Sequence, residues 1–168
     1  MGRMRVNKLK YEGNKYQFES TEFDKNIILI EGDNGTGKST FCNLIYFALG
    51  GEVPIFRKNN NTRHYEITSD SDNYVDLYIS INDNTYLLRR YFNDNEITVI
   101  PYERVVKKIY LDDDDTLVEE RVNFLLLEDK TEIYPINRGS ETYVFSDWLL
   151  SKLEISVVEL FHGYNTCS

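Results

Sequence analysis

The sequence predicts a mixed α/β fold in which a glycine-rich loop precedes an antiparallel β subdomain. Three observations lead to this prediction. A continuous apolar run at 27–30 ends at a glycine-rich segment that begins at Gly32. A helical apolar stripe follows the glycines directly. Short stretches in which polar and apolar residues alternate then extend to about residue 100. A strand, a loop and a helix are therefore expected first, and β-hairpins after them.

The first third of the chain contains the strand, the loop and the helix. Two short strands are expected at 4–11 and 15–19. The run Ile27 to Ile30 has no polar position, which is typical of a strand buried on both faces. After Gly37, apolar residues recur at helical spacing, and the helix is expected to end before Gly50. The stripe comprises Phe41, Leu44, Ile45, Ala48 and Leu49.

The middle of the chain predicts an antiparallel meander. Residues 52–73 are rich in Asn and Asp and are expected to form a loop. Three strands at 75–81, 85–92 and 96–100 follow, and Asn-Asp-Asn sequences separate them. The first of these strands alternates between apolar and polar residues, so its two faces are expected to differ.

The last third is less regular. Two β-like stretches, 104–111 and 121–127, flank the acidic run 112–115, which we expect to be a solvated turn. A further short strand is expected at 142–145. Ser146 is the expected N-cap of a helix. The apolar side chains of that helix are Trp148, Leu149 and Leu153.

Composition limits the class of protein. The 168 residues are 41% hydrophobic and 14% aromatic, which is enough for a core. The net charge of −9 opposes general coating of DNA but leaves room for a local basic patch. No apolar run reaches the roughly 20 residues that a membrane span needs, and no signal peptide is recognisable. Cys42 and Cys167 have neither metal nor redox spacing, so we expect a cytoplasmic protein.

The glycine-rich segment matches the pattern G-x-x-x-x-G-K-[ST] in full. Its glycines allow backbone N–H groups to converge on phosphate oxygens, and the following helix adds its positive dipole end. Lys38 is expected to reach the β- and γ-phosphates, and Ser39 to ligate Mg²⁺. The pattern therefore predicts a nucleoside triphosphate site, with ATP and Mg²⁺ as the expected ligands. Its residues are Gly32, Asp33, Asn34, Gly35, Thr36, Gly37, Lys38, Ser39 and Thr40.

The run from Ile28 to Thr40 resembles the "G-x-N-G-x-G-K-S-T" start of the structural-maintenance-of-chromosomes (SMC) group of ABC-type ATPases. That group includes double-strand-break-repair ATPases and related bacterial defence ATPases. The Ala-Leu-Gly end of the predicted helix is similar to theirs, and so is the strand from Tyr86 to Arg90. The resemblance covers about 4–92 and, more loosely, 143–163.

The resemblance implies an α/β P-loop NTPase lobe of ABC/SMC type with an antiparallel β subdomain. Residues 1–168 would form one N-terminal lobe of an ATPase head. A P-loop core would lie at about 1–51, the antiparallel subdomain at about 52–145, and a terminal helix with a degenerate Q-loop-like strand at about 146–168.

The same resemblance implies partners outside this lobe. A coiled coil would lead to a C-terminal lobe that carries the signature motif, the Walker B acids and a switch His. Two heads would form a homodimer that sandwiches two ATP molecules. Hydrolysis of ATP to ADP and phosphate would be coupled to DNA binding, repair, organisation or defence. Accessory or nuclease subunits would be further partners, and no association with a membrane is expected. This lobe alone is expected to be inactive.

One departure concerns the Q-loop, whose Gln in that group helps to hold Mg²⁺ and the attacking water. The only Gln in this chain is Gln17, upstream of the P-loop. The stretch that would match is 157–163, and the resemblance implies that His162 takes the place of that Gln. Imidazole can position a water but is a poorer Mg²⁺ ligand than an amide oxygen. The alternative is that His162 is an ordinary loop residue.

Two further groups of residues have both a functional and a structural interpretation. Arg57, Lys58 and Arg63 follow the P-loop helix, where they would contact phosphate or DNA or else belong to a polar loop. The apolar run that ends at Glu128 and Asp129 superficially resembles a Walker B strand; the alternative is a strand end in solvent. Finally, Arg89 and Arg90 are expected to pair with acids across the sheet, and Cys42 to be packed.

Three functions are consistent with the sequence. The first is an SMC-like ATPase in which Lys38, the loop amides and Mg²⁺ stabilise charge and the catalytic base comes from another lobe. The second is a nucleotide-binding regulatory or assembly module without turnover. The third is an autonomous small P-loop NTPase that uses Glu128 or Asp129.

Overall fold

The computed structural model describes residues 2–57, 65–111 and 114–155. The strands are β1 (Met4–Glu12), β2 (Gln17–Glu19), β3 (Tyr74–Ile81), β4 (Asn84–Tyr91), β5 (Glu96–Leu111), β6 (Asp114–Leu126) and β7 (Glu132–Pro135). The helices are α1 (Lys38–Ala48), α2 (Tyr65–Thr68) and α3 (Phe145–Lys152), with 3-10 turns η1 (Pro54–Phe56) and η2 (Glu128–Lys130).

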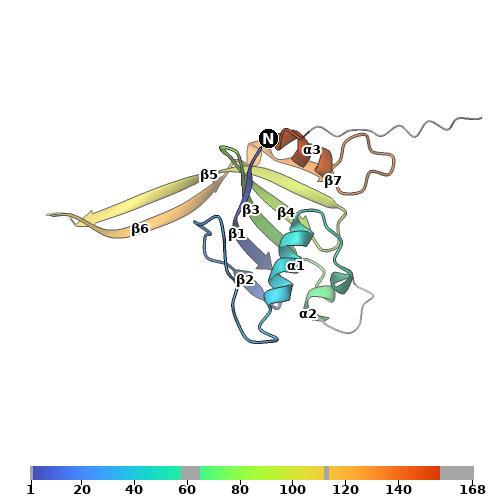
Figure 1. The fold of residues 1–168 in the computed structure, drawn as a ribbon, viewed down its shortest axis with the longest axis horizontal. Coiled ribbons are helices and arrows are strands. Elements are labelled where there is room, and N and C mark those ends of the chain that lie inside the picture. Colours follow the sequence, from blue (N-terminus) through green and yellow to red (C-terminus); the bar gives the residue numbers. More distant parts are fainter. Residues whose placement is uncertain (1, 58–64, 112–113, 156–168) are drawn as a thin grey trace, which may run out of the picture.

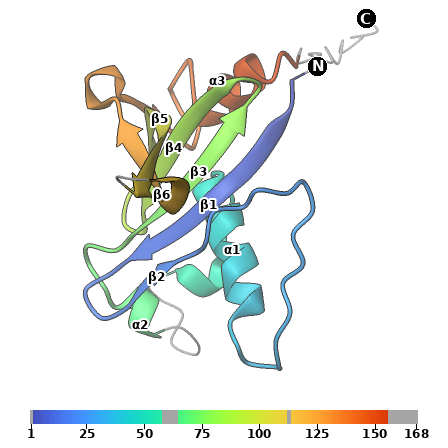
Figure 2. The same ribbon diagram turned by 90° about the vertical axis from the view of Figure 1, so that its left-hand side faces the viewer.

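The described strands form one antiparallel sheet, in the order β2-β1-β3-β4-β5-β6, with β7 paired to β5. Figures 1 and 2 show α1 on one face of this sheet and α3 beside the end that holds the N-terminus. The predicted meander is confirmed, because β3, β4 and β5 follow one another through tight turns. β1, which precedes residue 51, pairs with β3, which follows it, so one sheet joins the two parts of the chain.

The core lies between the sheet and α1. Alternate residues of β3 face α1 and are at most 2% exposed, namely Val75, Leu77, Ile79 and Ile81. From the helix, Leu44, Phe47 and Ala48 are buried against them, and the Phe47 ring stacks on Phe92 with centroids 4.5 Å apart. Alternation with period two on the strand and a stripe on the helix therefore produce a joint core, as the sequence predicts.

The two adjacent arginines of β4 point to opposite faces of the sheet. Arg89 donates two hydrogen bonds to the buried carboxylate of Asp76, at 2.7 and 2.8 Å, as expected. Arg90 is different, because it donates to the carbonyl oxygens of Phe47 and Gly51 at 2.6 and 2.8 Å. Burial lowers the pKa of Arg90 to about 10. The prediction of an acidic partner is therefore wrong for Arg90, which instead binds carbonyls at the C-terminal end of α1, where a cation is favourable.

A long hairpin projects from the sheet (Figure 1). The expected strands 96–100 and 104–111 are one continuous strand, β5, and β6 returns beside it. At the base of the hairpin, the Phe124 ring lies 4.9 Å from Tyr78 and 5.1 Å from Tyr102, centroid to centroid. Beyond this aromatic contact the described side chains are mostly exposed, so the base of the hairpin holds it to the sheet.

Several local predictions need correction. Residues 142–145 are not a strand; α3 begins at Phe145, and its N-cap is Val144, not Ser146. The Val144 N–H donates to Asp147 at 2.9 Å, which satisfies the helix start. The expected loop at 52–73 contains η1 and α2, and β7 was not predicted. In addition, Cys42 is exposed rather than packed. Within the described ranges, no helix combines the length and apolar character that crossing a membrane requires.

Candidate nucleotide-binding site

The glycine-rich loop ends where α1 begins, with Gly37 as the N-cap. Gly35 and Gly37 have φ values of +88° and +89°, a region that L side chains rarely adopt. Inside the loop, the Thr36 hydroxyl and N–H both donate to the Asp33 carbonyl oxygen, at 2.7 and 3.3 Å. These conformations tighten the loop into a turn directly in front of the helix N-terminus, where anions are favoured.

Lys38, the first residue of α1, turns back over the loop. Its ammonium donates to the carbonyl oxygens of Gly32 and Asp33, the latter at 2.7 Å. The positive charge therefore lies within the loop, where a triphosphate would need it. The neighbouring Ser39 is exposed, so its hydroxyl is accessible to a cation. Loop, lysine and hydroxyl fit a magnesium-bound nucleotide by residue type and placement. Among the described residues there is no separate cluster of three metal-binding side chains.

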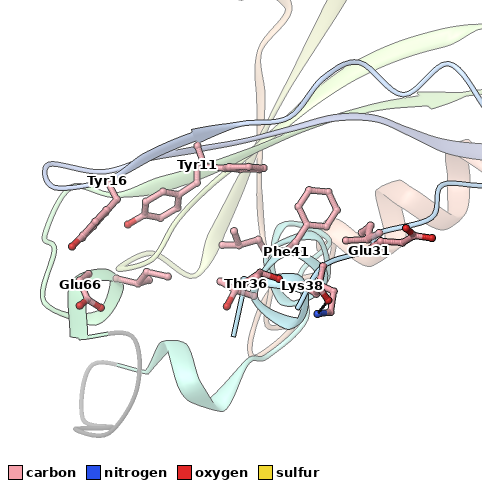
Figure 3. A pocket seen from close by; sticks show the side chains of 14 residues that line it. Tyr11, Tyr16, Glu31, Thr36, Lys38, Phe41 and Glu66 are labelled. Atoms are coloured by element: carbon pink, nitrogen blue, oxygen red, sulfur yellow. Dashed lines mark hydrogen bonds between the residues drawn. The ribbon is translucent and has the colours of Figure 1, made fainter. Parts of the chain in front are cut away.

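A cavity of about 790 Å³ opens beside the loop. Figure 3 shows Thr36 and Lys38 on one side of it and Tyr11, Tyr16 and Glu66 on the other. Most of its lining is aromatic or aliphatic apart from the loop itself. The full lining is Tyr11, Tyr16, Phe18, Ile30, Glu31, Gly32, Thr36, Gly37, Lys38, Thr40, Phe41, Leu44, Glu66 and Ile67. The cavity thus joins a phosphate-type loop to a space suited to a flat apolar group.

The segment before the loop differs most from prediction. Ile27 to Ile30 is not a strand, and its four side chains are 39–87% exposed. Figure 2 shows the chain between β2 and α1 as a wide loop that stands apart from the sheet. The prediction of a strand buried on both faces is wrong for this chain, because no described strand lies beside the segment to pair with it.

Basic residues after α1 are only partly described. Arg57 is exposed and pairs with Glu52 at 2.5 Å. It does not line the cavity beside the loop. Lys58 and Arg63 lie outside the described residues, and so does His162. Their predicted contacts with phosphate, DNA or Mg²⁺ stay predictions.

The Walker B-like interpretation of Glu128 and Asp129 is not supported by their position. Both belong to η2, a short turn after the antiparallel strand β6, and both are exposed. Asp129 lines a different cavity of about 460 Å³, together with Trp148 and Lys152. That cavity shares no lining residue with the one at the P-loop. The structure agrees with the alternative, a strand end that turns into solvent.

The sequence did not predict the residues that line the cavity opposite the P-loop. Tyr11 comes from β1, Phe18 from β2 and Glu66 from α2. The aromatic residues of the first hairpin are visible in the sequence, but their common direction follows only from the register, which places Tyr11 opposite Phe18. Glu66 belongs to a polar stretch with no periodicity, so no sequence signal points to it.

Comparison with known proteins gives one family. Searches of curated proteins and of solved structures found no match. A family model described as "AAA domain" matches residues 10–146, a range that contains both the P-loop and the antiparallel sheet. An AAA-type domain is a P-loop ATPase-like region, and this agrees with the loop, lysine and cavity described above. The chain therefore belongs to the AAA domain family.

Proposed function

We propose that this chain is the ATP-binding N-terminal lobe of an SMC-like ATPase head, a single lobe over residues 1–168. The observation that carries the proposal is the position of Lys38, whose ammonium lies in the P-loop at the edge of an aromatic cavity. A triphosphate would replace the loop carbonyls as the partner of this ammonium. The base would then extend toward the aromatic wall.

Each loop element has a defined part in this proposal. The loop amides and Lys38 would bind the phosphates, and Ser39 would hold Mg²⁺. Mg²⁺, when bound, would neutralise phosphate charge. Because no carboxylate from a Walker B-type strand is among the described residues that line the cavity, we assign the catalytic base to another lobe. This lobe alone would therefore bind ATP without hydrolysing it.

The exposure of the segment Ile27 to Ile30 supports the proposal that another protein segment binds there. Four consecutive exposed apolar residues that pair with no described strand are unusual on a surface in contact with water. A strand from a C-terminal lobe of the same head, laid beside this segment, would bury the side chains and pair the backbone. We propose this lobe as the first partner, a second head as the next, and DNA as the ligand that the full assembly handles.

Steady-state ATP hydrolysis by the full-length protein tests the proposal, with and without DNA. We expect turnover that DNA stimulates and that Lys38→Ala abolishes. Turnover that DNA does not stimulate would contradict the SMC-like assignment but would still support ATPase activity. Turnover that survives Lys38→Ala would contradict the role of the P-loop itself.

A second candidate is a nucleotide-binding assembly module without turnover. The lack of a Walker B-type acid at the described cavity favours it. It predicts Lys38-dependent binding of Mg–ATP by the full-length protein and no phosphate release. An autonomous NTPase that uses Glu128 is less consistent with the structure; it alone predicts that Glu128→Ala stops turnover while ATP still binds.

A further inference from the structure

We infer that Tyr11 and Glu66 read the base of the bound nucleotide and select one that carries an exocyclic amine beside a ring nitrogen, as adenine does. This inference rests on the proposed function, because it concerns the same cavity. It gives a role to two residues, and neither the P-loop pattern nor the family match assigns one to them.

The cavity has a phosphate end and a base end. Figure 3 shows Lys38 and Glu31 at one end, Tyr16 and Glu66 at the other, and Tyr11 above the space between them. All five residues line the same cavity. A nucleotide held by its phosphates at Lys38 would therefore direct its base toward the tyrosines and Glu66.

Tyr11 offers a hydrogen-bond donor to this space. Its side chain is 4% exposed, and its hydroxyl oxygen accepts from the Asn73 side-chain amide at 3.1 Å. The same Asn73 nitrogen donates to the Ile67 carbonyl oxygen at 2.9 Å. The Ile67 carbonyl fixes the orientation of the amide, because turning the amide round would place two oxygens together. The Tyr11 oxygen is thus the acceptor.

The proton of the Tyr11 hydroxyl remains available. The hydroxyl makes no hydrogen bond as a donor within the described residues. Burial raises the pKa of Tyr11, so the proton is retained at neutral pH. A buried donor without an acceptor is costly. A ligand atom with a lone pair, such as a ring nitrogen, would satisfy it.

Glu66 offers the complementary acceptor. It lies in the first turn of α2 and is exposed. Within the described part of the chain it has neither a hydrogen bond nor an ion pair. An ionised carboxylate can only accept. An exocyclic amine would donate to it, whereas a carbonyl oxygen in the same place would be repelled.

Donor and acceptor together define the chemistry of the base. Adenine presents its amine next to ring nitrogens that accept, which matches Glu66 and Tyr11. Hypoxanthine has nearly the same shape and stacking surface but carries an oxygen in place of that amine. Comparing ATP with ITP therefore isolates the two polar contacts from stacking and from phosphate binding.

The test is isothermal titration of the full-length protein with Mg–ATP and Mg–ITP. We expect the wild type to bind ATP at least about tenfold more tightly than ITP, since a hydrogen bond to a charged group is lost with ITP. Glu66→Gln should reduce this ratio to about twofold or less, because an amide can donate as well as accept. Tyr11→Phe should weaken ATP by about fivefold or more and ITP much less.

Two controls separate recognition of the base from general damage. Tyr74 lies on the opposite face of the sheet, next to Val75, which pairs with Tyr11; Tyr74→Phe should leave both affinities unchanged. Glu31 is the carboxylate at the phosphate end, so Glu31→Gln should alter ATP and ITP binding equally and preserve their ratio. Thermal unfolding of each variant verifies that it is folded.

The outcomes distinguish this inference from the function on which it rests. Equal wild-type affinities for ATP and ITP would overturn the inference, as would a ratio that Glu66→Gln does not change. Lys38-dependent binding of both nucleotides would still support the proposed function. If neither nucleotide binds, the proposed function itself fails.

Discussion

Two leucines show how differently two regions of the molecule are built. Leu77 lies in β3 and is completely buried, whereas Leu29, in the segment before the P-loop, is 78% exposed. Both lie in stretches that the sequence predicts to be strands, Leu77 in an alternating one and Leu29 in a continuously apolar one. The difference is that β3 has β1 on one side and β4 on the other, while no described strand lies beside 27–30.

The comparison teaches that an apolar stretch is buried where strands pair on both sides of it, as in β3, and stays exposed where no described strand pairs with it, as at 27–30. Backbone groups of a strand need partners, and an apolar run gains stability only from surfaces that cover it. Between β1 and β4, and beneath α1, Leu77 has both. Among the described residues Leu29 has no strand that pairs with it and is 78% exposed, so we propose that its contribution depends on the partner lobe.

The largest expected effect comes from shortening the two leucines. Leu77→Ala should lower the free energy of unfolding by about 2–5 kcal/mol, because it leaves a cavity in the core. Leu29→Ala should change it by about 0.5 kcal/mol or less in the 168-residue chain without the proposed partner lobe. Urea unfolding of both variants measures the difference. Equal losses would show that the segment is buried in solution and would break the comparison.

A smaller effect is expected on the other face of the sheet. Asp76 is 1% exposed and accepts both hydrogen bonds from Arg89. Asp76→Ala should cost about 1–3 kcal/mol in urea unfolding, because Arg89 loses the partner that raises its pKa. The double variant that combines Asp76→Leu with Arg89→Met should recover part of the loss, since it leaves no unpaired charge. An Asp76→Ala variant as stable as the wild type would contradict this account.

The smallest effect concerns the pH dependence of stability near the turn between β1 and β2, which Asp70 contacts through Asn14. Hydrogen bonds from the backbone N–H groups of Asp72 and Asn14, and from the Asn14 side chain, lower the pKa of Asp70 below its ordinary 3.8. Stability from Asp70 is therefore present above that value and is lost as the pH falls through the lower, folded pKa. Asp70→Asn should flatten this acid limb in urea unfolding between about pH 6 and about pH 2. An unchanged acid limb would show that these bonds do not persist in solution.

The sequence predicts the fold well where the pattern is local. Alternation in β3, the helical stripe of α1 and the turn residues between strands each depend on neighbours in the chain. The P-loop is equally local, because eight consecutive residues define it. The strand β3, the helix α1 and the turns between the strands are confirmed in the structure, together with the ion pair of Arg89 and Asp76. The binding role of the individual P-loop residues stays a prediction.

The rest depends on contacts between distant segments. Arg90 binds the end of α1 rather than an acid, because the packing of the helix brings two carbonyl oxygens to it. Tyr11 and Glu66 meet in one cavity only through the pairing of β1 and β3 and the position of α2. The segment Ile27 to Ile30 has the pattern of a strand and does not form one. A strand needs a neighbouring strand to pair with, and the local sequence does not show whether one is present.

The central claim is that the P-loop holds the triphosphate. Isothermal titration of the folded protein with Mg–ATP tests it most directly, with Lys38→Ala as the comparison. The account predicts one site per chain, a loss of affinity of about 100-fold or more in the variant, and the same unfolding midpoint for both proteins in the absence of nucleotide. If the variant binds Mg–ATP as tightly as the wild type, the nucleotide lies elsewhere and the account is wrong.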